Sequence, residues 1–105
     1  MAEINASIKE ILNEFLGQLK ENGIPIEAAY LFGSYAKGRE KEWSDIDVAI
    51  ISPDFSDDLF EERLNLMKIA VPIDDRIEPK PYNKKLFNRN DPLVDEIQRN
   101  GLQVV

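Results

Sequence analysis

Two aspartates lie two residues apart in the middle of the chain, in the segment SDIDVAIIS. We predict a strand from Asp45 to Ser52, because its second half is continuously apolar. On a strand, residues two apart point to the same face, with Cα atoms about 6.6 Å apart. Two negative charges this close need a counter-ion, and oxygen ligands suit Mg²⁺ or Mn²⁺. Asp45 and Asp47 are therefore candidate metal ligands, unless they are simply the solvated end of a strand.

A Gly-Ser pair precedes these aspartates. Gly33 and Ser34 follow a predicted strand over residues 26–32 and open a polar loop. A glycine lets backbone N–H groups approach an anion, and the serine hydroxyl can donate to it, so the pair could hold a phosphate. The alternative is a strand-to-helix turn with a small capping serine. Three basic residues of the loop could neutralise phosphates or be merely solvated: Lys37, Arg39 and Lys41.

The amino-acid composition limits the catalytic groups that this chain could use. The chain has 105 residues, of which 43% are hydrophobic and 31% charged, and this favours one globular domain over residues 1–105. It contains no Cys and no His, which removes disulfides, thiolate nucleophiles and the usual general base. An enzyme of this composition would have to work with carboxylates. The formal charge of -7 repels nucleic-acid phosphates, so we do not expect direct nucleic-acid binding.

The elements that position these residues can be read from apolar spacing and from glycine and proline. The predicted order is α-β-loop-β-α-β-α, typical of a single α/β domain. The first helix runs over residues 3–22, and the third strand over residues 73–80, with its far end placed by Pro79 and Pro81 at a sheet edge or beyond the pairing. The last helix is capped by Asp91 and closed by Gly101.

The middle helix begins at Ser56 or Asp57 and ends before Pro72. Its apolar residues Phe60, Leu64 and Met67 are spaced as one face of a helix, and we expect them to be buried. The N-terminal residues lack the pattern of a signal peptide, and no apolar run approaches the roughly 20 residues of a membrane span. We therefore expect a cytoplasmic protein with no membrane segment.

Gly33, Ser34, Gly38, Ser44, Asp45 and Asp47 together resemble the motif of the DNA polymerase beta-like nucleotidyltransferase superfamily, and within it the minimal nucleotidyltransferases. The resemblance implies a small mixed β-sheet flanked by helices, in the order α-β-α-β-α-β-α. It also implies that Gly33 and Ser34 hold nucleotide phosphates, with Lys37 beside them. Asp45 and Asp47 would coordinate the divalent ions, Mg²⁺ or Mn²⁺, that carry the triphosphate.

The family also uses a third carboxylate on a later strand, which binds metal and deprotonates the attacking group. Glu78, three residues before the Pro81-Tyr82 pair, is our candidate for this catalytic and metal-binding role. Asp74 shares its strand face by parity and is the alternative. A glutamate in place of the family's aspartate must reach the same ion from farther back.

The resemblance implies a metal-dependent enzyme that moves a nucleoside monophosphate, most simply AMP from ATP, to an acceptor and releases pyrophosphate. Minimal nucleotidyltransferases are commonly encoded beside a HEPN-domain toxin, which they silence by adenylylation and complex formation. Such a partner would here be a separate polypeptide. The alternative is a non-catalytic module of the same fold that binds nucleotide or partner. Self-association is compatible with so small a chain, but the spacing of its residues identifies no surface for it.

Overall fold

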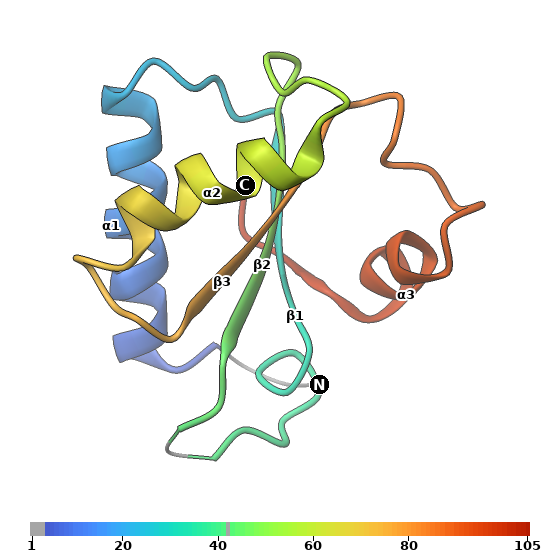
Figure 1. The fold of residues 1–105 in the computed structure, drawn as a ribbon. Coiled ribbons are helices and arrows are strands. Elements are labelled where there is room, and N and C mark those ends of the chain that lie inside the picture. The colour runs from blue at the N-terminus through green and yellow to red at the C-terminus, as the bar shows by residue number, and fades with distance from the viewer. Residues whose placement is uncertain (1–3, 42) are drawn as a thin grey trace.

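The structure is a computed structural model that describes residues 4–41 and 43–105, so the expected helix start at Glu3 lies outside the described residues. The described residues form three helices and four strands (Figure 1): α1 (Ala6–Glu21), β1 (Ala28–Phe32), β2 (Ile46–Ile51), α2 (Leu59–Ala70), β3 (Ile77–Tyr82), α3 (Pro92–Asn100) and β4 (Leu102–Gln103). The strands make one mixed sheet in the order β3-β2-β1-β4, in which β2 and β3 are parallel and the other pairs antiparallel.

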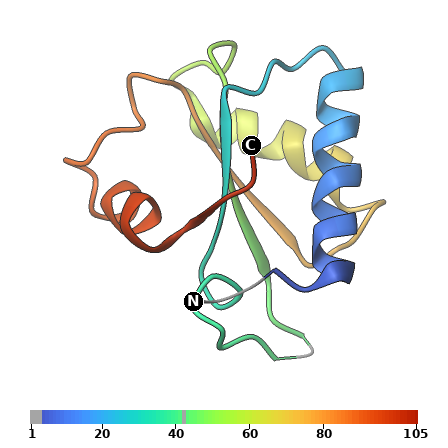
Figure 2. The ribbon, with the colours of Figure 1, turned by 180° about the vertical axis from the view of Figure 1, so that it is seen from behind.

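Helices cover both faces of this sheet. Two opposite views show α1 and α2 on one face and α3 on the other (Figure 1, Figure 2). Along β2, Val48 and Ile50 join the cluster beneath α1 and α2, whereas Ala49 and Ile51 join the cluster beneath α3. Because side chains alternate along a strand, Asp47 points to the α3 face. The predicted α/β class, with a small mixed sheet flanked by helices, is confirmed.

The first and last helices each begin after a capping side chain. Asn5 caps α1, accepting a hydrogen bond from the Ser7 N–H at 2.8 Å. Asp91 caps α3 in the same way through Leu93 at 2.9 Å, and Gly101 follows its last residue. Side-chain capping of free N–H groups at a helix start is a local effect, which is why the start of α3 at Asp91 could be predicted. The Asn5 cap was not predicted.

Two segments depart from the expected order of elements. Residues 33–38, where the family order has a helix, form turns, with Lys37 donating its N–H to the Gly33 carbonyl at 3.2 Å. The C-terminal residues form β4, which was not predicted, and pair Gln103 with Tyr30 of β1. A strand of two residues is too short to show an alternating pattern in the sequence, and its conformation depends on pairing with β1.

The third strand begins four residues later than expected. The carboxylate of Asp74 accepts a hydrogen bond from the Arg76 N–H at 2.9 Å, and the Asp74 carbonyl accepts one from the Ile77 N–H at 3.2 Å. This turn precedes β3, so Asp74 does not lie on the strand, and the parity argument for it was wrong. The edge position expected for Pro79 and Pro81 is confirmed by the sheet order.

Helix α2 presents a different face to the core from the one expected. It begins at Leu59 after the capping residue Asp58, and its fully buried side chains are Leu66 and Ala70. Phe60 is instead 74% exposed and Leu64 48% exposed, while Met67 is only half-buried. The helix carries two apolar stripes, and spacing alone does not decide which one meets the sheet. None of the described helices combines the length and the apolar composition needed to cross a bilayer.

Replacement of Leu66 by Ala should destabilise the fold far more than replacement of Leu64 by Ala. Leu66 is fully buried, so its truncation leaves a cavity and should lower the free energy of unfolding by about 2–5 kcal/mol. Leu64→Ala should change it by less than about 1 kcal/mol, because half of that side chain is already in solvent. Urea unfolding at low protein concentration measures both values. Equal losses would contradict the orientation of α2.

Candidate active site

The end of β1 and the start of β2 meet at Gly33. Phe32 pairs with Asp47 in the antiparallel ladder, which places the next residue, Gly33, beside the Asp47 carboxylate. A Cβ at Gly33 would overlap Oδ2 of Asp47, and its φ of +73° is one that side chains disfavour. Both the lack of space for a Cβ and the positive φ therefore require glycine at this position. Ser34 follows, half-buried, and its carbonyl accepts the Arg39 N–H at 2.9 Å.

Asp47 and Glu78 are neighbours across the parallel ladder between β2 and β3. Burial of Asp47, followed by the negative charges of Asp45 and Glu78, raises its pKa to about 6, although the positive charge of Lys80 opposes the shift. Asp45 is exposed and lies just before β2. The three sequence-predicted carboxylates therefore interact electrostatically around Asp47, and their repulsion favours any cation that enters between them.

Glu78 has a cationic partner that the sequence did not reveal. The carboxylate of Glu78 forms an ion pair with Arg63 of α2, at 2.8 Å. An open cavity of about 190 Å³ surrounds this pair, and we call it the Asp47 cavity. It is lined by Phe32, Asp47, Arg63, Glu78, Pro79, Lys80 and Leu93.

Two cations thus share the Asp47 cavity with two carboxylates. Lys80 could have been found from the sequence, because it lies two residues after Glu78 and shares its strand face. Nothing in the sequence indicates that Arg63 belongs to this cavity, because only the packing of α2 against β3 brings it to Glu78. The two cations can hold anionic groups beside the carboxylates.

The remaining candidates have other partners. Asp74 accepts two hydrogen bonds from the Arg76 guanidinium, at 2.9 and 3.1 Å, and this interaction with Arg76 lowers its pKa. Lys37, expected beside the phosphates, forms an ion pair with Glu96 of α3 at 3.1 Å. The structure therefore brings Gly33, Asp47 and Glu78 together, and it gives Asp74 a separate role in the turn before β3.

The donors fit a hard divalent ion. Asp45 and Asp47 supply oxygen ligands only, and a cation between them would relieve the repulsion that raises the pKa of Asp47. Glu78 already uses one carboxylate oxygen, Oε2, in its ion pair with Arg63, so it would join such a site through its other oxygen or by leaving Arg63. Within residues 4–41 and 43–105, no three acidic side chains are already gathered into a ligand set.

Replacing Asp47 by Asn should stabilise the protein at neutral pH but not in acid. The carboxyl has a pKa of about 6 in the folded chain against a usual 3.8, so the folded state binds its proton more tightly than the unfolded state. The stability that this group provides is present at low pH and is lost as pH rises from about 4 to about 6. Asn cannot ionise and avoids that loss.

Thermal unfolding of the wild type and of Asp47→Asn measures the effect. We expect the variant to melt higher at about pH 7, with the difference vanishing near pH 3. Asp54→Asn, at an exposed loop position, is the control. A constant difference at both pH values would contradict the raised pKa.

The sequence of this chain is similar to those of known proteins. A model of the nucleotidyltransferase domain family matches residues 11–101. A Methanocaldococcus jannaschii protein named "Putative protein adenylyltransferase MJ0141" is 31% identical over 106 residues, which cover 97% of this chain and 99% of that protein. Protein adenylyltransferase MntA of Shewanella oneidensis is 32% identical over 66 residues, covering 63% of this chain and 47% of MntA.

Solved structures agree in fold. The crystal structure of a toxin-antitoxin with AMP-PNP aligns with a TM-score of 0.65 and 28% identity, over 89% of this chain and 71% of that one. The chain spans about half the length of two of the curated relatives that it matches, 51% and 47%. The family model nevertheless covers most of the chain, including the Gly33 turn and both acidic strands of the site, and we conclude that the chain belongs to the nucleotidyltransferase domain family.

Proposed function

We propose that this nucleotidyltransferase transfers AMP from ATP to a hydroxyl group of a protein acceptor, with a divalent ion bound at Asp45 and Asp47. The observation that carries the proposal is that the Gly33 turn lies against the carboxylate of Asp47, which lines one cavity together with Glu78. The names of MJ0141 and MntA support adenylyl transfer to protein. The AMP-PNP of the solved toxin-antitoxin supports a nucleoside triphosphate as the substrate.

The reaction forms one bond and breaks one. The acceptor oxygen attacks the α-phosphorus of ATP, and the bond from that phosphorus to the bridging oxygen of pyrophosphate breaks. Gly33 and Ser34 hold the phosphates by backbone N–H groups and a hydroxyl. A divalent ion, Mg²⁺ or Mn²⁺, would neutralise the triphosphate and stabilise the leaving pyrophosphate.

Glu78 accepts the proton of the attacking hydroxyl in this proposal. Its carboxylate lines the Asp47 cavity and pairs with Arg63 at 2.8 Å, which holds the group in position. Arg63 and Lys80 line the same cavity and can stabilise negative charge that develops on the phosphoryl oxygens. Catalysis would rest on positioning and on charge neutralisation.

We further propose that the acceptor is a toxin, a separate HEPN-domain polypeptide in the same cytoplasm, and that the chain acts as its antitoxin. Support comes from the toxin-antitoxin structure, which is 28% identical to this chain. The chain's charge of -7 is compatible with a protein acceptor and opposes nucleic acid. Recovery of a HEPN protein with the tagged chain from its native host would test this assignment, and repeated absence of such a protein would contradict it.

One observation favours a second function, a binding module that transfers nothing. The third carboxylate, Glu78, is already paired with Arg63, so a metal or base role competes with this ion pair. Release of pyrophosphate from ATP in the presence of acceptor distinguishes the two. Tight partner binding that survives loss of Asp45, with no turnover, would favour the module.

Replacing both Asp45 and Asp47 by Asn should abolish Mg²⁺-dependent ATP binding. The variant lacks the two oxygen-ligand charges that would hold the ion, and so loses the ion that screens the triphosphate. Calorimetric titration with ATP, with and without Mg²⁺, measures the loss, and Asp54→Asn serves as the matched control. Unchanged Mg²⁺-dependent binding in the double variant would refute the site.

Glu78→Gln should slow AMP transfer by about 100-fold or more while ATP binding changes little, because loss of a general base typically costs that much. Asp74→Asn should leave transfer within a few-fold of wild type, since its carboxylate interacts with Arg76. Pyrophosphate release and transfer of radiolabel from ATP to host proteins measure both variants. A larger loss of AMP transfer in Asp74→Asn than in Glu78→Gln would instead identify Asp74 as the third carboxylate.

A further inference from the structure

Helix α2 carries a line of apolar side chains on its outer side. We call Phe60, Leu64, Met67 and Val71 the α2 stripe, in which Val71 is the capping residue that follows the end of the helix at Ala70. Phe60 is 74% exposed, and Leu64 and Val71 are each 48% exposed. Their spacing of four, three and four residues is that of a seam between two packed helices. An open groove of about 610 Å³ runs along Leu64, Met67 and Val71. Exposed apolar residues gathered in one line mark an interaction surface.

We propose that the α2 stripe binds the α2 stripe of a second copy of this chain, with the two helices antiparallel about a two-fold axis. The axis passes midway between Leu64 and Met67, so Leu64 faces Met67 of the second copy. Phe60 then faces Val71 of the second copy, which sets a large side chain against a small one. A two-fold axis uses the same surface twice, and the stripe is self-complementary in this way.

The charges beside the stripe select this arrangement. Glu61 and Lys68 each follow a stripe residue and flank it on the same side. In the antiparallel pair, Glu61 lies next to Lys68 of the second copy, and the symmetry creates this contact twice. In the parallel pair, Arg63 would lie next to Lys68 of the second copy, which is repulsive. Opposite charges at such flanking positions set the orientation of helix pairs.

Both flanking charges are available for this contact. Glu61 and Lys68 are exposed, and in the described part of the chain neither belongs to an intramolecular ion pair within 4.0 Å. Arg63, in contrast, is held by Glu78. The stripe is thus bordered on one side by charges that the chain itself leaves unmatched.

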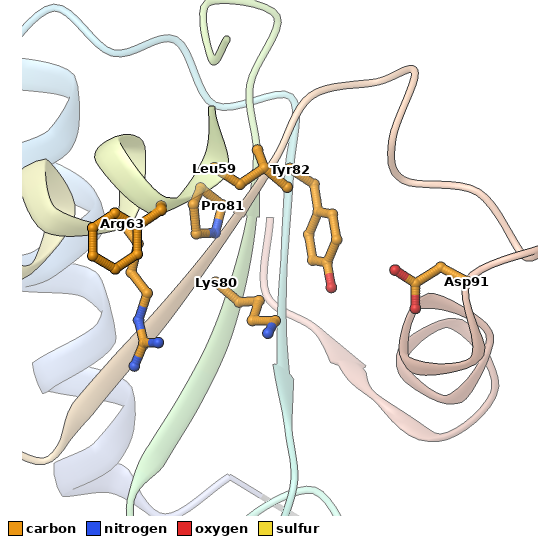
Figure 3. A pocket seen from close by; sticks show the side chains of 7 residues that line it. Leu59, Arg63, Lys80, Pro81, Tyr82 and Asp91 are labelled. Carbon is orange, nitrogen blue, oxygen red and sulfur yellow. The ribbon is translucent and has the colours of Figure 1, made fainter. Parts of the chain in front are cut away.

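The stripe reaches the active-site region through Phe60. Phe60 lines a second cavity, of about 270 Å³, together with Arg63, Lys80 and the ring of Tyr82. Arg63 and Lys80 also line the Asp47 cavity. Figure 3 shows their cationic ends pointing toward the end of the sheet where β1 stops. In the proposed dimer, Val71 of the second copy packs on Phe60 and so adds to the wall of this neighbouring cavity.

Sedimentation velocity over about 5–500 μM measures the association. Only two helices meet, so we expect a weak dimer, with a Kd on the order of 10–100 μM. Glu61→Lys places Lys beside Lys68 of the second copy twice and should raise Kd by about tenfold or more. Lys68→Glu should do the same. The double variant Glu61→Lys/Lys68→Glu restores opposite charges and should return Kd to near the wild-type value.

Glu10→Lys, an equal charge change at an exposed position of α1, is the control and should leave Kd unchanged. Leu64→Lys should give a folded monomer at every concentration, with thermal unfolding as the check on folding. A wild type that stays monomeric up to the highest concentration would overturn the proposal. So would charge reversals with no effect or a double variant as weak as the single ones.

These variants lie outside the proposed nucleotide site. Mg²⁺-dependent ATP binding should be unchanged in Glu61→Lys, so a dimer that fails to form and a nucleotide site that fails to bind are distinguishable results. Association of the wild type with intact ATP binding in the charge variants supports the surface independently of the chemistry.

Discussion

The contact between Gly33 and the Asp47 carboxylate is the constraint on which the site depends. The pairing of β1 with β2 brings the two residues together, and only a residue without a side chain leaves room for the carboxylate. The same pairing fixes which face of the sheet Asp47 joins, since a shift of one residue would send it toward α1 and α2. The pairing of β1 with β2 thus determines both the position of the Gly33 turn and the direction in which the Asp47 carboxylate points.

The charged residues of the site come from three elements that meet only in the folded chain. β2 supplies Asp47, β3 supplies Glu78 and Lys80, and α2 supplies Arg63. Burial and like charges raise the pKa of Asp47, while Arg63 lies against Glu78. The sheet therefore holds two carboxylates side by side in different environments. Paired carboxylates in unequal environments are a usual basis for dividing roles between two otherwise similar groups.

The sequence predicted what local chemistry determines. The cap at Asp91 follows from a side chain that satisfies a nearby N–H group, and the pair Asp45 and Asp47 follows from strand alternation. The cap of α1 at Asn5 was not predicted. Two features, the orientation of α2 and the partner of Glu78, were not predicted because they depend on residues that are distant in sequence. Which stripe of α2 faces the sheet is a matter of tertiary packing. The partner of Glu78 lies 15 residues away in sequence, on that same helix.

The two prolines of β3 limit how this molecule can associate. The carbonyls of Arg76 and Tyr82 accept hydrogen bonds from the N–H groups of Ile46, in β2, and Ser52, just after it, so by alternation the backbone groups of residues 77, 79 and 81 face outward from the sheet edge. At Pro79 and Pro81 that edge has no N–H to donate. A further strand cannot complete a ladder there, and this protects the longest free edge of the sheet from templated β-aggregation. Any assembly at this edge therefore has to form through side chains. Single surface substitutions can then change which molecules associate there without changing the sheet.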